Sequence, residues 1–165
     1  YSCNTTDEDE LNEAMEELKI QSKLNKAYTI DEVRDKMING AAAIGVIYSG
    51  EYLYCQEENE DLEYVIPKEG TNIWYDGWVI TKGSENVENA HKWIDFLCSQ
   101  EAAYDNFEYI YYGTPNIAAQ ELIDEDIINN PGVFPDEETI EKCEVYNYLG
   151  EEAEDMYYEL WKKVK

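Results

Sequence analysis

Apolar residues recur at intervals of three or four along much of the chain, which is the spacing of amphipathic helices. The first helix is predicted to begin within residues 4–9, where Thr5 and Thr6 each precede an acid by three residues, as in a capping box. Further helices are predicted over 29–40, 51–56, 86–98, 101–110, 117–123, a short segment opened by Pro135, and 150–165. The predicted buried faces are Leu11, Ala14, Met15 and Leu18; Ile30, Val33 and Met37; Val87, Ala90, His91, Ile94 and Leu97; and Ala153, Met156, Tyr157, Leu160, Trp161 and Val164.

Three other stretches predict β-strands. Residues 42–48 form a continuous apolar run after a helix, which is typical of a buried strand in a parallel sheet. Residues 62–67 and 73–81 are predicted as two more strands, separated by a loop over 68–72. The predicted fold class is therefore α/β, with several helices around a short sheet.

The charge of the chain excludes one class of partner. There are 38 acidic residues against 12 basic ones, so the formal net charge is −26. A nucleic-acid partner is excluded, because such binding needs Lys and Arg to displace counterions from phosphates. Disorder is excluded too, because 44% of the residues are hydrophobic and 13% are aromatic. The charge favours a neutral or cationic partner for a folded acidic chain.

Residues with catalytic or metal-binding chemistry are sparse. The four cysteines, at 3, 55, 98 and 143, form no CxxC pair, and His91 is the single histidine, so neither a metal site nor a cofactor is predicted. The cysteine spacing leaves free thiols and one or two disulfides open as alternatives. A Cys–His91 dyad is the one ordinary nucleophilic pair available, and no recognisable motif surrounds it, so the chain is predicted not to be an enzyme.

One segment carries specific binding chemistry. In Ile73–Trp78, strand alternation would place Trp74, Asp76 and Trp78 on one side and Tyr75 on the other. A carboxylate flanked by indole rings suits an organic cation, because the carboxylate pairs with the charge and the ring faces cover the methylenes. The alternative is an ordinary aromatic strand that packs on a helix.

Four blocks of the sequence resemble a known family. They resemble the C-terminal half of the spermidine/putrescine-binding component of polyamine ABC transporters, and they cover nearly the whole chain. The blocks are Tyr1–Asp7, Ile44–Gly50, Pro67–Asp76 and Tyr112–Ala119. The resemblance implies part of a two-lobed, type II periplasmic-binding-protein fold that closes on its ligand. The last block is shared with relatives that bind other ligands.

The resemblance also implies roles for individual residues. Trp74 would pack along the methylene chain of a polyamine, and Asp76 would hold an ammonium or imino group. The family's further contact positions fall on Tyr48, where Trp is usual, on Tyr112, on Tyr146, where Gln is frequent, and on Thr29.

The resemblance implies a missing part as well. Residues 1–72 would belong to the second lobe together with a crossover, and residues 73–165 to the C-terminal part of the first lobe. The opening strands and further acids would precede Tyr1, so the chain is expected to be a piece of a longer protein, without a leader of its own. It would be periplasmic or extracellular, anchored through the missing segment, and would deliver its polyamine to a membrane permease. By itself it would hold half a site and associate through an exposed sheet edge.

Three other functions stay open at the level of sequence. The same fold could bind another organic cation or small solute, such as a metal-bound anion. A cysteine-dependent enzyme and a purely structural acidic surface domain are the alternatives from other classes.

Overall fold

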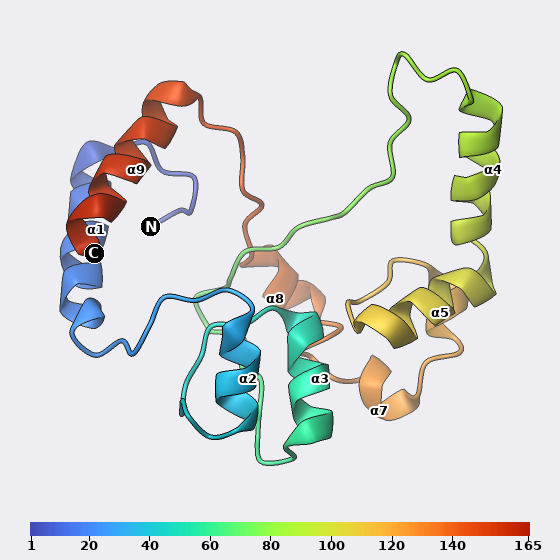
Figure 1. Cartoon of the computed structure of the whole chain (residues 1–165), viewed down its shortest axis with the longest axis horizontal. Helices are drawn as coiled ribbons and strands as arrows, with labels where there is room; N and C mark the ends of the chain where they lie inside the picture. The colour runs from blue at the N-terminus through green and yellow to red at the C-terminus, as the bar shows by residue number, and fades with distance from the viewer.

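Nine helices and no β-strand make up the regular structure, and a computed structural model describes all 165 residues (Figure 1). The helices are α1 (Glu8–Ser22), α2 (Glu32–Ile38), α3 (Ser49–Glu58), α4 (Val87–Leu97), α5 (Gln100–Ile110), α6 (Ile117–Gln120), α7 (Glu125–Ile128), α8 (Glu137–Glu141) and α9 (Glu151–Val164). α1 packs beside α9, α2 beside α3, and α5 contacts both α4 and α6. Long open connections join these groups, and both chain ends lie at the α1–α9 pair (Figure 1).

The α1–α9 pair forms because each helix has the apolar face predicted from its sequence. Leu11 and Met15 of α1 are buried, and so are Ala153 and Val164 of α9. The remaining predicted positions on both helices are half-buried, which confirms the two faces. This pairing joins the first 22 residues to the last 15 and so brings the two ends of the chain together.

The start of α1 is set by a different residue from the predicted one. The Asp7 carboxylate accepts hydrogen bonds from the amides of Asp9 and Glu10, at 2.9 and 3.1 Å, and so satisfies two of the unpaired donors at the helix end. Thr5 instead donates to the Glu10 side chain at 2.5 Å. The predicted capping box at Thr5 and Thr6 is therefore wrong, although the helix itself is confirmed.

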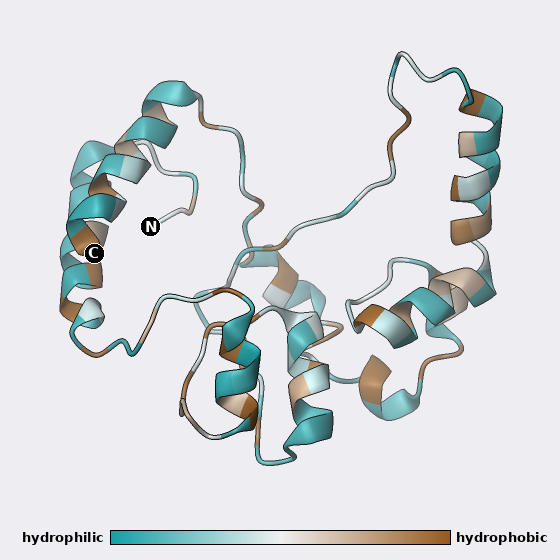
Figure 2. Cartoon of the chain, viewed as in Figure 1, coloured by the Kyte–Doolittle hydropathy of each residue, from teal (hydrophilic) through white to brown (hydrophobic).

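Two predicted apolar faces are poorly covered. Ile30 lies before α2 and is 72% exposed. α4 has no buried residue, and both Val87 and His91 are exposed. Figure 2 shows hydrophobic residues on α4, which contacts the neighbouring α5. The face of α4 is amphipathic as predicted, but its residues are at most half-buried.

A small core holds α3, α5 and the segments on both sides of α7 together. It consists of five buried residues, namely Tyr52, Leu53, Phe107, Ile123 and Val133. Phe107 is its most buried member, at 1% exposed, with its ring 6.0 Å from that of Phe134. This core positions the ends of α3 and α5, which carry the candidate site.

The three predicted strands are not formed. The backbones of residues 43–47, 63–66 and 74–80 make no backbone–backbone hydrogen bond, and the one β-bridge is an isolated parallel pair, Asn72 with Glu144. Apolar side chains on these segments are exposed, among them Ile44 at 90%, Val46 at 95% and Val79 at 83%. A strand needs a hydrogen-bonded neighbour, and this chain supplies none, so apolar segments typical of buried strands run as open connections.

Candidate functional site

Three of the predicted site residues come together as an aromatic cluster. Tyr48 is the N-cap residue of α3, Trp74 lies on the open connection before α4, and Tyr112 lies two residues after α5. The Trp74 ring centroid is 5.3 Å from that of Tyr48 and 5.9 Å from that of Tyr112, and both pairs meet edge to face. We call these three residues the aromatic triad. Trp74 stays 39% exposed and Tyr48 52% exposed, so their rings can contact a ligand.

Two carboxylates lie near the triad. Burial raises the pKa of Tyr112, the carboxylate of Glu51 raises it further, and Asp76 adds a smaller effect of the same sign. The Arg34 guanidinium partly neutralises Glu51, because its Nη1 lies 3.1 Å from Glu51 Oε2. The same guanidinium also packs on Tyr54, with its Cζ 4.6 Å from the ring centroid. Asp76 is exposed and makes no ion pair within the chain, so its charge is available to a cationic ligand.

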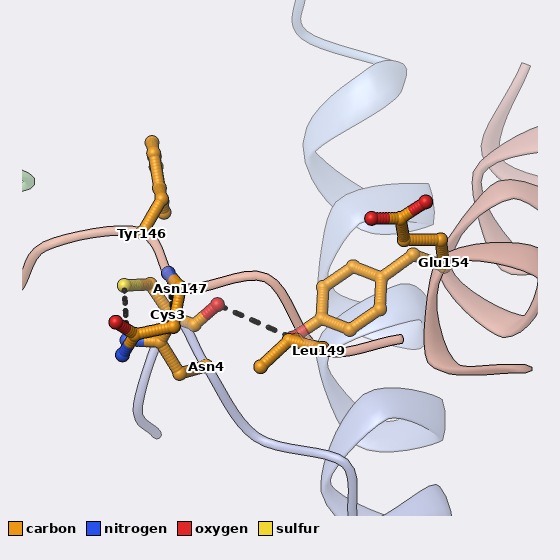
Figure 3. Close-up of a pocket in the computed structure, with 7 residues that line it drawn as sticks. Cys3, Asn4, Tyr146, Asn147, Leu149 and Glu154 are labelled. Atoms are coloured by element: carbon orange, nitrogen blue, oxygen red, sulfur yellow. Dashed lines mark hydrogen bonds between the residues drawn. The ribbon is translucent and has the colours of Figure 1, made fainter. Parts of the chain in front are cut away.

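Tyr146 approaches the triad from a separate part of the chain. Burial raises its pKa, and the charges of Cys3 and Tyr48 raise it further, so both lie within electrostatic reach of Tyr146. Tyr146 also lines an open pocket of about 450 Å³ formed by Cys3, Asn4, Tyr146, Asn147, Leu149, Glu154 and Tyr157. Figure 3 shows Cys3 and Asn4 of the N-terminal segment lying against the connection that carries Tyr146 and Asn147.

Hydrogen bonds fix the connection that carries Tyr146. Glu144 accepts from the side chains of Ser2, Cys3 and Asn4, and these donors lower the pKa of its carboxyl group. The Asn4 amide also donates to the Val145 carbonyl at 2.9 Å. The segment that carries Tyr146 is thus held by contacts with residues 2–4.

The sixth predicted residue lies elsewhere. Thr29 is exposed and makes no hydrogen bond, and its neighbour Tyr28 packs edge to face on Trp161 of α9 at 5.0 Å. The structure therefore gathers Tyr48, Trp74 and Tyr112, and it sets Asp76 and Tyr146 within electrostatic reach of them. No group of His, Cys, Asp and Glu side chains is arranged to hold a metal ion, and all four cysteines are free thiols.

Sequence reasoning missed two residues that border the triad. Glu51 comes three residues after Tyr48, and that spacing places the two on one side of a helix once α3 is extended back to Ser49. Gly50 is buried, and a Cβ atom on it would lie 2.4 Å from the Tyr112 ring. No local pattern signals that second contact, because residues 50 and 112 meet only in the fold.

Comparisons with known proteins identify the family. A family model described as bacterial extracellular solute-binding protein matches residues 5–135. The chain belongs to this family. The chain is 35% identical to a spermidine/putrescine-binding periplasmic protein of Salmonella typhimurium and 34% identical to that of Escherichia coli, each over 165 residues. The alignments cover the whole chain but 47% of each relative, so the chain spans about half their length.

Solved structures of family members agree with the fold. A putative spermidine/putrescine ABC transporter from Listeria monocytogenes is 40% identical, with a TM-score of 0.85 over 99% of this chain and 51% of its own. A spermidine/putrescine ABC transporter substrate-binding protein from Streptococcus pneumoniae is 36% identical, with a TM-score of 0.86 over 100% of this chain and 52% of its own. The predicted partial type II fold is confirmed. The relatives from Salmonella typhimurium, Escherichia coli and Streptococcus pneumoniae are named as binding proteins, in agreement with the predicted family. No helix here has the length and apolar character to cross a membrane.

Proposed function

We propose that the chain forms part of the ligand site of a solute-binding protein that delivers spermidine or putrescine to an ABC importer. The observation that carries the proposal is the aromatic triad with Asp76 beside it. A polyamine alternates ammonium or imino groups with methylene runs, so it needs charge partners and apolar ring surfaces in one place. The triad and Asp76 offer both, and the family relatives named above bear spermidine and putrescine in their names.

In this proposal each residue has a separate task. Trp74 covers methylenes with its ring, and Asp76 pairs with one cationic nitrogen. Tyr48, Tyr112 and Tyr146 enclose the chain of the ligand. Thr29 contributes a hydroxyl only if the segment before α2 lies closer to the triad in the ligand-bound protein.

The experiment is a calorimetric titration of the complete protein that carries this chain, with spermidine and with putrescine. Asp76→Asn keeps the size of the side chain and removes its charge. We expect affinity to fall roughly 10- to 150-fold, because a charge-assisted hydrogen bond contributes about 1.5–3 kcal/mol. Asp95→Asn, at an exposed carboxylate on α4, is the matched control and should leave the affinity unchanged. Equal affinities for wild type and Asp76→Asn would remove Asp76 from the site.

A second candidate is a site for another organic cation or small solute. The exposed rings of the triad favour cations in general and do not select a chain length. A thermal-shift screen of the same protein with polyamines, amino acids and iron chelates separates the two, since only a bound ligand raises the midpoint.

The remaining parts of the proposal concern context. We propose that residues 1–72 and 73–165 belong to different lobes, that a further segment anchors the protein at the membrane, and that a permease receives the ligand. The open segments around Ile44 and Val79 would pair with strands from another half of the protein, or with a second copy when that half is absent. Sedimentation of the isolated chain tests self-association. We expect a species larger than a monomer, and we expect the average sedimenting mass to increase with added salt, because salt screens the charge of −26.

A further inference from the structure

The chain turns in an unusual way just before Tyr112. Tyr111 is the one non-glycine residue with a positive φ, at 58°, a left-handed conformation that side chains rarely adopt. Its amide donates to the Phe107 carbonyl at 2.7 Å, which closes the end of α5. This single residue ends the helix and sets the direction in which Tyr112 leaves it.

Residues 111 and 112 are attached to α3 at two points. The Tyr111 hydroxyl donates to Glu57 Oε1 at 2.6 Å, near the C-terminal end of α3. This hydrogen bond, together with burial, raises the pKa of Tyr111 to about 12, so the hydroxyl stays a donor at neutral pH.

The second attachment lies at the other end of α3. The Tyr112 ring packs directly on Gly50, where a Cβ atom would lie 2.4 Å from two ring carbons and 2.8 Å from the Ile110 carbonyl oxygen. Only a residue without a side chain allows this approach. α3 therefore fixes Tyr112 at Gly50, two residues after Tyr48, which caps the same helix.

We propose that Tyr111 and Gly50 are positioning residues that hold Tyr112 edge to face against Trp74 and so preform the aromatic surface. The inference rests on the proposed polyamine site only for its functional consequence, because the packing itself exists without ligand. Glu57 contributes to the same positioning, because it accepts the hydrogen bond from the Tyr111 hydroxyl. Neither positioning residue contacts the ligand in this proposal.

The surroundings of Gly50 allow a sharp perturbation. A cavity of about 220 Å³ borders Gly50, Tyr111 and Tyr112. Gly50→Ala would force the Tyr112 ring and the Ile110 carbonyl away from α3. The adjacent cavity has room for the displaced ring. Tyr111→Phe is a milder second variant that keeps the ring and removes only the hydrogen bond to Glu57.

The experiment is fluorine NMR of the 165-residue chain labelled with 5-fluorotryptophan, without ligand. The chain has four tryptophans, and Trp74→Phe assigns the Trp74 resonance. We expect Gly50→Ala and Tyr111→Phe to move that resonance by more than its line width and to leave the other three in place. The matched controls are Gly83→Ala, where a Cβ atom would meet nothing within 4 Å, and Tyr109→Phe, at a tyrosine that is 87% exposed.

An unchanged Trp74 resonance in both variants would overturn the proposal, and so would equal shifts in the controls. If Gly50→Ala fails to fold, all four resonances move together, and Tyr111→Phe alone then decides. In the complete protein, Gly50→Ala should lower polyamine affinity about 2- to 12-fold, the range for one lost aromatic contact. If the variants shift the Trp74 resonance but the complete protein binds no polyamine, the proposed function is wrong and the positioning role is retained.

Discussion

Replacing Phe107 by alanine should remove most of the stability of the unit that carries Tyr48 and Tyr112. Phe107 is 1% exposed and is the most buried member of the small core between α3 and α5. Truncating such a phenylalanine costs about 3–5 kcal/mol, from lost burial and from the cavity left behind. Stabilities of folded domains are typically about 5–15 kcal/mol. Only 14 of the 165 residues here are buried, which argues for the lower end of that range.

The matched control is Phe96→Ala, because Phe96 is 55% exposed on α4 and its ring meets only that of Trp93, at 5.6 Å. We expect this variant to lose at most about 1 kcal/mol. Urea unfolding of the 165-residue chain, followed by far- and near-ultraviolet circular dichroism, measures both. Thermal unfolding followed by the same signals should show a melting temperature lowered by about 6–20 °C in Phe107→Ala, for a chain of this length.

The opposite outcome is an equal change in the urea midpoint for Phe107→Ala and Phe96→Ala, with equal dependence on urea. Such a result would mean that the core around Phe107 contributes no more to stability than an exposed helix surface. In that case the ends of α3 and α5 could not be fixed by this core, and the geometry of the aromatic triad would need another source.

Two further predictions follow from titratable and reactive groups. The side chains of residues 2–4 lower the pKa of Glu144, so this group stabilises the fold above the usual glutamate pKa, and that stability is lost as the pH falls through the lowered value. Urea unfolding at pH 6 and pH 3 should therefore show a weaker pH dependence in Glu144→Gln than in the wild type, and identical dependence would contradict the contact. Cys98 is exposed and Cys55 is buried, with burial raising the pKa of the Cys55 thiol, so a thiol reagent should modify Cys98 far faster. Mass spectrometry of the modified peptides measures this order, and faster labelling of Cys55 would show that α3 is not packed as described.

Helices were predictable from this sequence because their hydrogen bonds are local. The faces of α1 and α9 emerge from three- and four-residue spacing alone, and each face finds the other within the chain. Strands were not predictable in this way, because their hydrogen bonds depend on another segment of chain. The apolar run over 42–48 has the composition of a buried strand, but its pairing partner is not in these 165 residues.

Only part of the candidate site could be predicted from the sequence. Trp74 and Asp76 stand out because a carboxylate between indoles is locally visible, and Tyr48 and Tyr112 follow from the family resemblance. The left-handed turn at Tyr111 and the close packing on Gly50 are tertiary features. They depend on where α5 ends relative to α3, which no spacing along the chain encodes.

In the proposed function, the aromatic triad and Asp76 bind a polyamine. The most direct measurement is a crystal structure of the complete protein grown with spermidine. We expect one cationic nitrogen about 2.7–2.9 Å from an Asp76 carboxylate oxygen, with the methylenes lying against the Trp74 ring. A ligand bound away from both Trp74 and Asp76 would contradict it.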